Sequence, residues 1–277
     1  MGTLYVVGTP IGNLEDITLR AIRVLREVAL IAAEDTRETR KLLARYDIVT
    51  PVTSYFEHNK LTKLDYLLDF ARTSDLAIVS DAGMPGISDP GYELIRAAIA
   101  AGLPVVPVPG PSAVLTALAV SGLPTDQFVY LGFLPRRPGD RRRALAEVAG
   151  ERRTLVAFES PHRLVESLTD ALAVLGDRRV ALARELTKVF EEVRRGTVSE
   201  LIRHLMAAPP RGEHTLVIEG APPSPAAPEE EVERRLAELT AAGVPAKEAV
   251  ARVSLATGRP RREVYRLLLA GRKYDKI

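Results

Sequence analysis

The chain has 277 residues, of which 46% are hydrophobic and 27% charged, as expected for a globular protein with room for more than one domain. Its 38 basic and 36 acidic residues nearly balance, and the absence of cysteine excludes disulfides, cysteine-ligated metals and thiol nucleophiles. No apolar run of 18 or more residues occurs and the first residues lack a signal-peptide pattern, so we expect a cytoplasmic protein that contacts no membrane.

Strand and helix patterns alternate over roughly the first 120 residues. Apolar runs typical of buried strands lie at 3–7, 29–33, 76–79 and 105–108. Helical patterns lie at 17–27, 36–46, 60–72, 89–101 and 111–120. Asp16, Ser88 or Asp89, and Gly110 stand where helix caps belong. This alternation predicts a mostly parallel sheet covered by helices on both faces, in a first domain over residues 1–123.

The next hundred residues follow a different pattern. Strand patterns lie at 127–133, 154–158, 180–185, 189–195 and 214–219, with helical patterns at 141–148, 163–175 and 198–207. The break between 185 and 189 is too short for a crossover helix and suits an antiparallel hairpin. We therefore predict a second α/β domain with a mixed sheet, over residues 124–221, and a cleft between the two domains.

A Pro-rich segment at 222–228 predicts an extended linker. Three helical patterns follow, at 229–241, 246–257 and 261–269, and predict a helix-turn-helix-like module over residues 229–277. Residues 245–277 hold nine basic and three acidic side chains, so this part of the chain is locally positive.

Loops rich in Gly and Pro follow three strands of the first domain. The longest, Ser80 to Gly91, comes where open α/β sheets bind ligands, and its alternative interpretation is an ordinary connection. The others run from Gly8 to Asn13 and from Pro109 to Ala113, and neither the dinucleotide-binding nor the P-loop glycine pattern is present. In the last of these, Pro111 suits a helix start, where free N–H groups would meet a polar ligand atom.

Ionisable side chains gather at the ends of second-domain strands and in a run of arginines. Glu159, His162 and Arg163 end one strand and Arg184 to Lys188 end another, where solvated surface is the plain alternative. Five arginines within residues 135–143 suggest an exposed loop able to neutralise phosphates. These arginines are Arg136, Arg137, Arg141, Arg142 and Arg143.

The motifs, taken in order, resemble one family. They are Gly8-Thr9-Pro10-Ile11-Gly12-Asn13, Glu34-Asp35-Thr36-Arg37, the 80–91 loop, Pro109-Gly110-Pro111-Ser112-Ala113, Gly132-Phe133-Leu134-Pro135, Glu159-Ser160-Pro161-His162-Arg163 and Arg184-Glu185-Leu186-Thr187-Lys188. The chain is similar to the tetrapyrrole methylase superfamily, and most of all to its members that methylate the ribose 2′-hydroxyl of a cytidine in bacterial 16S ribosomal RNA.

The resemblance implies that S-adenosylmethionine binds in the cleft, held largely by backbone groups. The matching positions are Pro10, Asp81, Gly83, Met84, Ser112, Ala113, Phe158, His214 and Thr215. Asp81 would balance part of the positive charge of the cofactor. The resemblance also implies a homodimer whose substrate is 16S ribosomal RNA, naked or in the assembled small subunit.

Methylation of a hydroxyl gains from a base that removes its proton, and Glu159, His162 and Lys188 are the candidates. Lys188 would need a depressed pKa for this role. Arg163 and Arg184 could hold the phosphates that flank the target nucleotide. Two alternatives stay open: a methyltransferase acting on a tetrapyrrole, and a ribosome-binding factor without catalytic activity.

Overall fold

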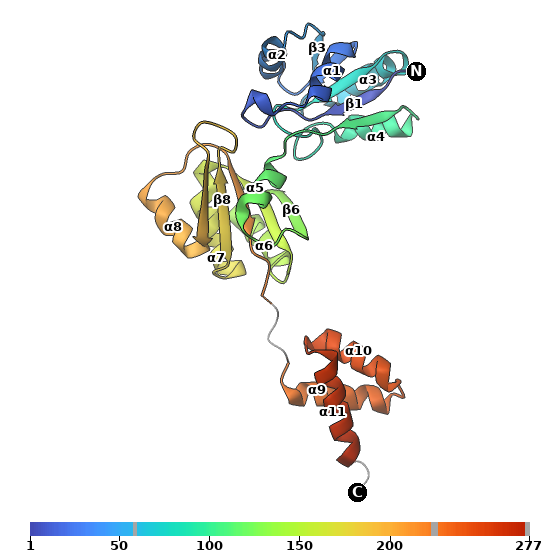
Figure 1. Ribbon diagram of the computed structural model, residues 1–277, viewed down its shortest axis with the longest axis vertical. Coiled ribbons are helices and arrows are strands. Elements are labelled where there is room, and N and C mark those ends of the chain that lie inside the picture. Colours follow the sequence, from blue (N-terminus) through green and yellow to red (C-terminus); the bar gives the residue numbers. More distant parts are fainter. Residues whose placement is uncertain (58–59, 223–226, 275–277) are drawn as a thin grey trace. The chain divides into compact units, whose positions relative to one another are not determined.

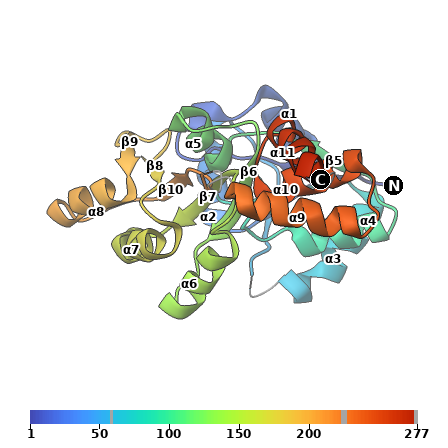
Figure 2. The ribbon, with the colours of Figure 1, turned by 90° about the horizontal axis from the view of Figure 1, so that it is seen from below.

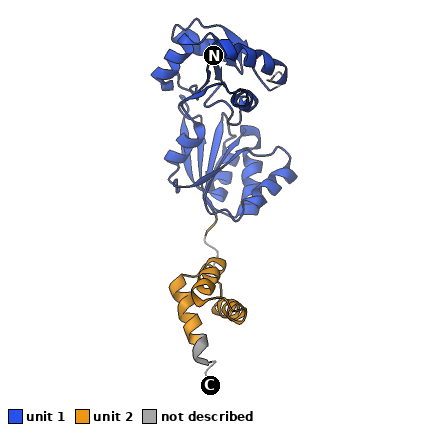
Figure 3. Ribbon diagram, turned by 90° about the vertical axis from the view of Figure 1, so that its right-hand side faces the viewer, with its two compact units in different colours: residues 1–220 blue, residues 221–277 orange. Residues whose placement is uncertain are grey.

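The computed structural model describes residues 1–57, 60–222 and 227–274. The chain divides into two compact units, Met1–Gly220 and Ala221–Ile277 (Figure 3). Two sheets lie in the first unit, and helices alone form the second (Figure 1). The described residues include no helix with the length and apolar character to cross a membrane.

The first sheet is parallel throughout, with strand order β3-β2-β4-β1-β5. Its strands are β1 (Leu4–Val7), β2 (Leu30–Ala33), β3 (Val52–Ser54), β4 (Leu76–Val79) and β5 (Val105–Val108). Every residue of β2 and β4 is buried, as expected for strands covered on both faces. This confirms the predicted parallel sheet, while β3 was missed.

Two pairs of helices cover this sheet. The helices are α1 (Leu19–Glu27), α2 (Thr36–Arg45), α3 (Lys60–Thr73) and α4 (Tyr92–Ala100), with a short 3-10 helix η1 (Leu14–Asp16) before α1. Apolar side chains of α1 and α2 pack on one face of the sheet, and leucines and alanines of α3 and α4 pack on the other.

Three predicted helix caps were wrong. Thr18 caps α1 in place of Asp16, and Ser112 caps the helix after β5 in place of Gly110. Gly91 precedes α4 without a side-chain cap, so neither Ser88 nor Asp89 has that role. The carboxyl group of Asp89 therefore does not stabilise the start of α4.

The second sheet is mixed, with order β6-β7-β10-β8-β9. Its strands are β6 (Phe128–Phe133), β7 (Thr154–Glu159), β8 (Arg179–Arg184), β9 (Glu192–Thr197) and β10 (His214–Ile218). β6 and β7 are parallel and the other pairs antiparallel, which confirms the predicted mixed sheet and its hairpin. The second strand of the hairpin begins three residues later than predicted.

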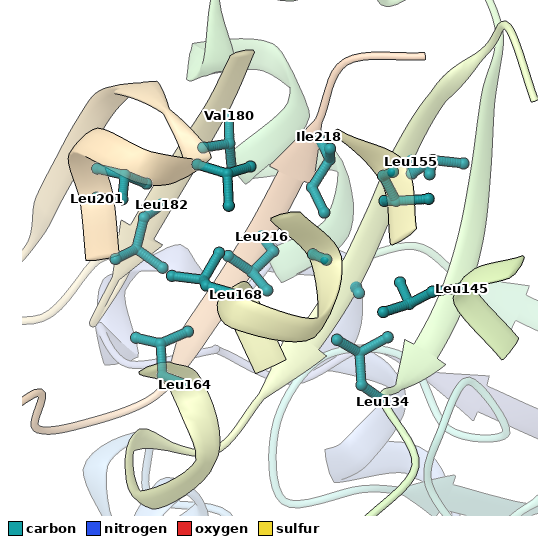
Figure 4. Close-up of a cluster of buried hydrophobic side chains, with 14 of the residues drawn as sticks. Leu134, Leu145, Leu155, Leu164, Leu168, Val180, Leu182, Leu201, Leu216 and Ile218 are labelled. Carbon is teal, nitrogen blue, oxygen red and sulfur yellow. The ribbon is translucent and has the colours of Figure 1, made fainter. Parts of the chain in front are cut away.

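Successive side chains on each strand of the second sheet point to opposite faces, so two separate clusters pack against the sheet. Val180 and Leu182 point to a cluster with α7 (Leu164–Leu175) and α8 (Val198–Ala207), whereas Ala181 and Ala183 face α5 (Ala113–Ser121). Figure 4 shows Leu164, Leu168 and Leu182 within the first of these clusters. In Figure 2, α5 lies on the opposite side of the sheet from α7 and from α6 (Pro138–Glu147).

The arginine-rich segment is not the exposed loop that we expected. From Pro138 onward it belongs to α6, which covers most of the helix predicted at 141–148 and begins three residues earlier, because proline suits the first helical turn. A 3-10 helix, η2 (Pro161–Arg163), joins β7 to α7. α5 packs on the second sheet although the sequence places it within residues 1–123.

Three helices form the second unit. They are α9 (Glu229–Ala241), α10 (Ala246–Thr257) and α11 (Arg261–Tyr274), close to the predicted patterns. Val232, Leu236, Val253, Val264 and Leu268 form a separate apolar core between them. Most of the predicted linker and the end of the predicted module, including Lys276, lie outside the described residues.

Candidate active site

Three loops of the first sheet meet backbone to backbone at the carboxyl ends of β1, β4 and β5. The amide of Gly8 donates to the carbonyl of Val108 over 3.0 Å, and Thr9 and Gly83 exchange backbone hydrogen bonds of 2.9 and 3.1 Å. A Cβ atom on Gly110 would lie 2.9 Å from the backbone of Gly8. Only glycine therefore allows these two loops to approach so closely.

A cavity of about 650 Å³ opens beside the three loops. Its other walls come from α5 and from residues at the ends of β7, β8 and β10 in the second sheet. The volume suits a small molecule, and most of the lining is apolar, with Phe133 and Phe158 in ring contact at 5.3 Å between centroids.

Seven of the nine positions matched to cofactor binding line this cavity. They are Gly83, Met84, Ser112, Ala113, Phe158, His214 and Thr215. Pro10 and Asp81 are not among the lining residues. The carboxylate of Asp81 instead accepts the backbone amide of Asp35 over 2.9 Å.

His214 is the most unusual polar group in the cavity wall. Its side chain is buried, with the residue 4% exposed, and within the described residues neither ring nitrogen has a hydrogen-bond partner. Burial and the nearby charge of Arg184 lower its pKa to about 4 and outweigh the opposite effects of Glu185 and of the backbone of Arg211, so the imidazole is neutral at physiological pH. A buried polar group without a partner indicates a ligand that supplies one.

Asp89 also lines the cavity, and sequence reasoning did not select it as a site residue. It belongs to the same loop as Asp81 and is half-buried. Burial, with the nearby carboxylates of Glu34 and Asp81, raises its pKa to about 7. The available signal was its place in the long Gly- and Pro-rich loop, where it was interpreted as a helix cap.

Glu159 lines the cavity but is committed to its own network. Its buried carboxylate accepts the amide of Ser160 over 2.7 Å, accepts the hydroxyl of Ser167, and pairs with Arg163 at 2.6 Å. This arrangement holds the end of β7 and η2 together. His162, in the same 3-10 helix, is exposed and does not line the cavity.

Lys188 does not meet the condition set for a base. Burial alone would lower its pKa, but hydrogen bonds and charges from Glu213 and Glu185 outweigh burial and raise the pKa above its ordinary value. The amine lies 2.9 Å from Glu213 and 3.0 Å from Glu185. Lys188 is thus a cation and lacks the depressed pKa that the role of base would need.

The prediction that Arg141 is exposed and able to neutralise phosphates was wrong, because its side chain is 1% exposed. Its guanidinium pairs with Asp170 of α7 at 2.7 Å, and Arg142 reaches the other oxygen of that carboxylate at 2.9 Å. Arg136, Arg137 and Arg143 are exposed, as is most of the Arg142 side chain. The basic surface at the start of α6 therefore consists of four arginines, two on the helix and two just before it.

Arg163 and Arg184 lie near the cavity and are only partly exposed. Arg163 is paired with Glu159, and Arg184 donates to the carbonyl of Arg211 over 2.9 Å. The described residues contain no group of acidic, histidine or cysteine side chains arranged to hold a metal ion.

The residues that line the cavity fit S-adenosylmethionine. Closely packed glycine loops offer backbone groups, the aromatic and aliphatic wall suits an adenine ring, and His214 has two ring nitrogens without a protein partner. The sequence predicted that glycine loops and His214 take part in cofactor binding. The structure adds that they line one cavity.

The family model described as Tetrapyrrole (Corrin/Porphyrin) Methylases matches residues 3–202, and the model of the RsmI C-terminal HTH domain matches residues 226–272. Ribosomal RNA small subunit methyltransferase I of Halalkalibacterium halodurans is 48% identical, with 96% of this chain and 94% of that protein covered. The protein of the same name from Bacillus subtilis is 42% identical, with 96% and 93% covered.

Solved structures show the same fold over the two sheets. Cobalt precorrin-4 methyltransferase matches with a TM-score of 0.59 and 18% identity, covering 78% of this chain and 94% of that chain. Diphthine synthase matches with a TM-score of 0.59 and 14% identity, covering 79% and 90%. The chain belongs to the tetrapyrrole methylase family, in the group of the ribosomal RNA small subunit methyltransferases I.

Proposed function

We propose that this chain transfers a methyl group from S-adenosylmethionine to the ribose 2′-hydroxyl of a cytidine in 16S ribosomal RNA. The observation that carries the proposal is the cavity at the carboxyl ends of β1, β4 and β5, with His214 unpartnered in its wall. The near full-length similarity to proteins named ribosomal RNA small subunit methyltransferase I supports the choice of substrate.

When bound, S-adenosylmethionine supplies an electrophilic methyl group on a positively charged sulfur. The glycine loops and the amide groups at the start of α5 bind its polar parts, and His214 supplies a hydrogen bond from the second sheet. Holding donor and acceptor in line lowers the barrier, because the displacement then costs little orientational entropy. The apolar wall excludes water from the reacting atoms.

The target nucleotide has to leave its stack to reach a donor in this cavity. Arg142 and Arg143 on α6, with Arg136 and Arg137 just before it, neutralise phosphates of the surrounding RNA, and the helical unit adds further basic side chains. Arg141 has no part in this surface because it is buried. The substrate is naked RNA or the assembled small subunit, and the protein works in the cytoplasm, where ribosomes form.

The active form we propose is a homodimer. α5 carries no charged residue, yet Ala119 and Val120 near its end are exposed, which suits an apolar contact with a second copy of the chain. Val120→Glu should therefore shift the protein from dimer to monomer in sedimentation equilibrium, because it places a charge in the interface. A wild-type monomer at micromolar concentration would contradict the proposed dimer.

Methyl-labelled S-adenosylmethionine and unmodified small subunits test the reaction directly. A 2′-O-methyl group blocks alkaline cleavage at its own linkage, so the label should appear in an alkali-resistant dinucleotide that contains cytidine. Label in mononucleotides would instead mean base methylation. RNA without label, despite binding of the cofactor, would favour a tetrapyrrole substrate or a ribosome-binding factor without catalysis.

A further inference from the structure

We infer that Phe133 is the platform on which the base of the target nucleotide stacks while its ribose meets the methyl donor. The inference rests on the methyl transfer to RNA proposed above. Phe133 ends β6, lines the cavity and is 57% exposed. Aromatic rings that are open to solvent are the surfaces on which proteins stack unpaired bases.

A β-bulge in β6 turns Phe133 toward the cavity. Three steps along β6, from Tyr130 to Phe133, lie opposite only two steps along β7, from Val156 to Phe158, so β6 holds one extra residue. Gly132, within the bulge, has a φ value of +66°. In a regular strand, side chains three positions apart point to opposite faces, but the bulge brings Phe133 to the same face as Tyr130. Bulges beside active sites often re-aim a side chain in this way.

Ring contacts hold Phe133 in this position. The ring of Phe158 contacts both neighbours, with centroid distances of 5.4 Å to Tyr130 and 5.3 Å to Phe133. The next residue, Leu134, belongs to the core cluster on the opposite face of the sheet. Tyr130 and Phe158 are half-buried, whereas Phe133 is exposed, so two fixed rings support one free ring. A side chain that is already held in place loses little conformational entropy when it binds a base.

The loop after β4 brings a second apolar side chain to the same part of the cavity. The hydroxyl oxygen of Ser88 lies 3.6 Å from the position that a Cβ atom on Gly132 would take, and it forms a 2.7 Å hydrogen bond with the hydroxyl of Tyr130. Ile87, beside Ser88, lines the cavity and is 54% exposed. A base that enters here meets an aromatic ring from β6 and an aliphatic side chain from the loop, and extruded bases are commonly held by such side chains.

The placement of charge and burial separates the base from the cofactor. Arg136 comes three residues after Phe133, within about 11 Å along the backbone, and Arg137 follows it. Both arginines are exposed, so the phosphates that they bind bring the RNA to the side of the cavity where Phe133 lies. His214 and Thr215, which suit the cofactor, are buried. The exposed side of the cavity is therefore left to the nucleotide.

Phe133→Ala tests the stacking. Loss of a stack between a base and an aromatic ring should lower kcat/KM for small subunits about 5- to 150-fold. Tyr66→Ala on α3 is the control and should match wild type, because Tyr66 is also an exposed aromatic residue but does not line the cavity. A Phe133→Ala variant as active as wild type would overturn the inference.

Conservative variants distinguish stacking from simple apolar contact. Phe133→Tyr keeps the ring at an exposed position and should stay within about threefold of wild type. Phe133→Leu keeps an apolar side chain but no ring, so it should show most of the loss seen in Phe133→Ala. Wild-type activity of Phe133→Leu, or a loss in Phe133→Tyr as large as in Phe133→Ala, would contradict the role of the ring.

Affinity for the cofactor shows which aromatic ligand Phe133 serves. The dissociation constant of S-adenosylmethionine, measured by calorimetry, should change less than about threefold in Phe133→Ala. Circular dichroism checks that this variant is folded. A loss of cofactor affinity as large as the loss of methylation would assign Phe133 to the adenine of the cofactor and overturn the inference.

A photocrosslink locates Phe133 without a measurement of activity. Benzoylphenylalanine can replace Phe133 in the full chain because the position is exposed. Irradiation with small subunits should attach it to the nucleotide that the wild type methylates or to a direct neighbour, and reverse transcription maps the attachment. Attachment elsewhere in the RNA would overturn the inference and leave the proposed function intact. A wild-type protein that methylates no ribose would remove the proposed function and this role together.

Discussion

His214 pairs burial with two ring nitrogens that have no hydrogen-bond partner among the described residues. Leaving a buried polar group unsatisfied costs about 1–3 kcal/mol. Such a cost is tolerated where a ligand removes it. His214 therefore lowers the stability of the free protein and raises its affinity for the ligand. The trade predicts opposite effects of one substitution on folding and on binding.

His214→Leu should keep the free energy of unfolding at pH 7 or raise it by about 1 kcal/mol, because leucine of similar volume needs no partner. Affinity for S-adenosylmethionine should fall at least tenfold, since the hydrogen bond to the ligand is lost. Denaturant unfolding and calorimetry measure the two effects. A variant that binds the cofactor as tightly as wild type would contradict the assignment.

Acid should destabilise the wild type more than His214→Leu. Below pH 6.5 the unfolded imidazole takes up a proton that the folded one accepts only near pH 4, so acid favours the unfolded state. Between pH 7 and pH 5 the wild type should lose about 2 kcal/mol more than the variant. Asp89 titrates alike in both proteins, so its contribution cancels.

The joint between α6 and α7 depends on the buried pair of Arg141 and Asp170. Removing one partner of a buried pair leaves an uncompensated charge, which costs roughly 3–5 kcal/mol. Because Arg142 still reaches Asp170, the loss expected for Arg141→Met is at the lower end, about 3 kcal/mol. Denaturant unfolding of the variant measures this loss.

Arg143→Ala is the matched change on the exposed side of the same helix. Its unfolding free energy should stay within about 0.5 kcal/mol of wild type. Its RNA affinity should fall, with a salt slope smaller by about one, because one phosphate contact is lost. If Arg143→Ala unfolds as easily as Arg141→Met, the separation of the two arginines into structural and RNA-binding roles is wrong.

The loops after β1 and β5 leave no room for a methyl group between Gly8 and Gly110. Gly110→Ala should push these loops apart and reduce the affinity for S-adenosylmethionine at least tenfold, because the cavity loses its shape. Calorimetry measures the affinity, and circular dichroism checks that the fold is kept. Gly139→Ala on α6 is the control, since nothing lies within 4 Å of its added Cβ.

The sequence predicts an element correctly where neighbouring residues alone determine its structure. β2 and β4 were predicted because strands buried on both faces need continuous apolar runs. β3 was missed, since its three half-buried residues leave no such run. The start of α6 was predicted at residue 141 instead of Pro138, because Pro138 and Gly139 stand in the first turn, where they do not break a helix.

The same distinction between local and long-range determinants applies to the candidate active site. Backbone loops were predicted at the right strand ends, since Gly and Pro mark them in the sequence. That Asp89 and not Asp81 lines the cavity depends on how the loop folds, and the loop contacts Tyr130, 42 positions from Ser88 in the sequence. The burial of Arg141 depends likewise on a partner 29 positions away.

The two compact units carry separate cores, so each can keep its structure without the other. In the helical unit, Arg252, Arg259 and Arg266 are engaged in ion pairs with glutamates. Lys247, Arg261 and Arg262 are exposed, and the described residues offer them no ion pair. The side chains of Arg272 and Lys273 lie outside the description. The unit therefore presents a smaller free positive charge than its sequence suggests.

Truncation after Gly220 tests how the work is divided between the units. The cavity belongs wholly to residues 1–220, so the truncated protein should bind S-adenosylmethionine within twofold of the full chain in calorimetry. Its RNA affinity should fall and its salt dependence weaken, because basic side chains that release counterions are gone. The full chain with Arg261→Ala and Arg262→Ala should show part of the same loss. Equal RNA affinity of the truncated and full chains would place all RNA contacts on the first unit, with the arginines of α6 as their main source.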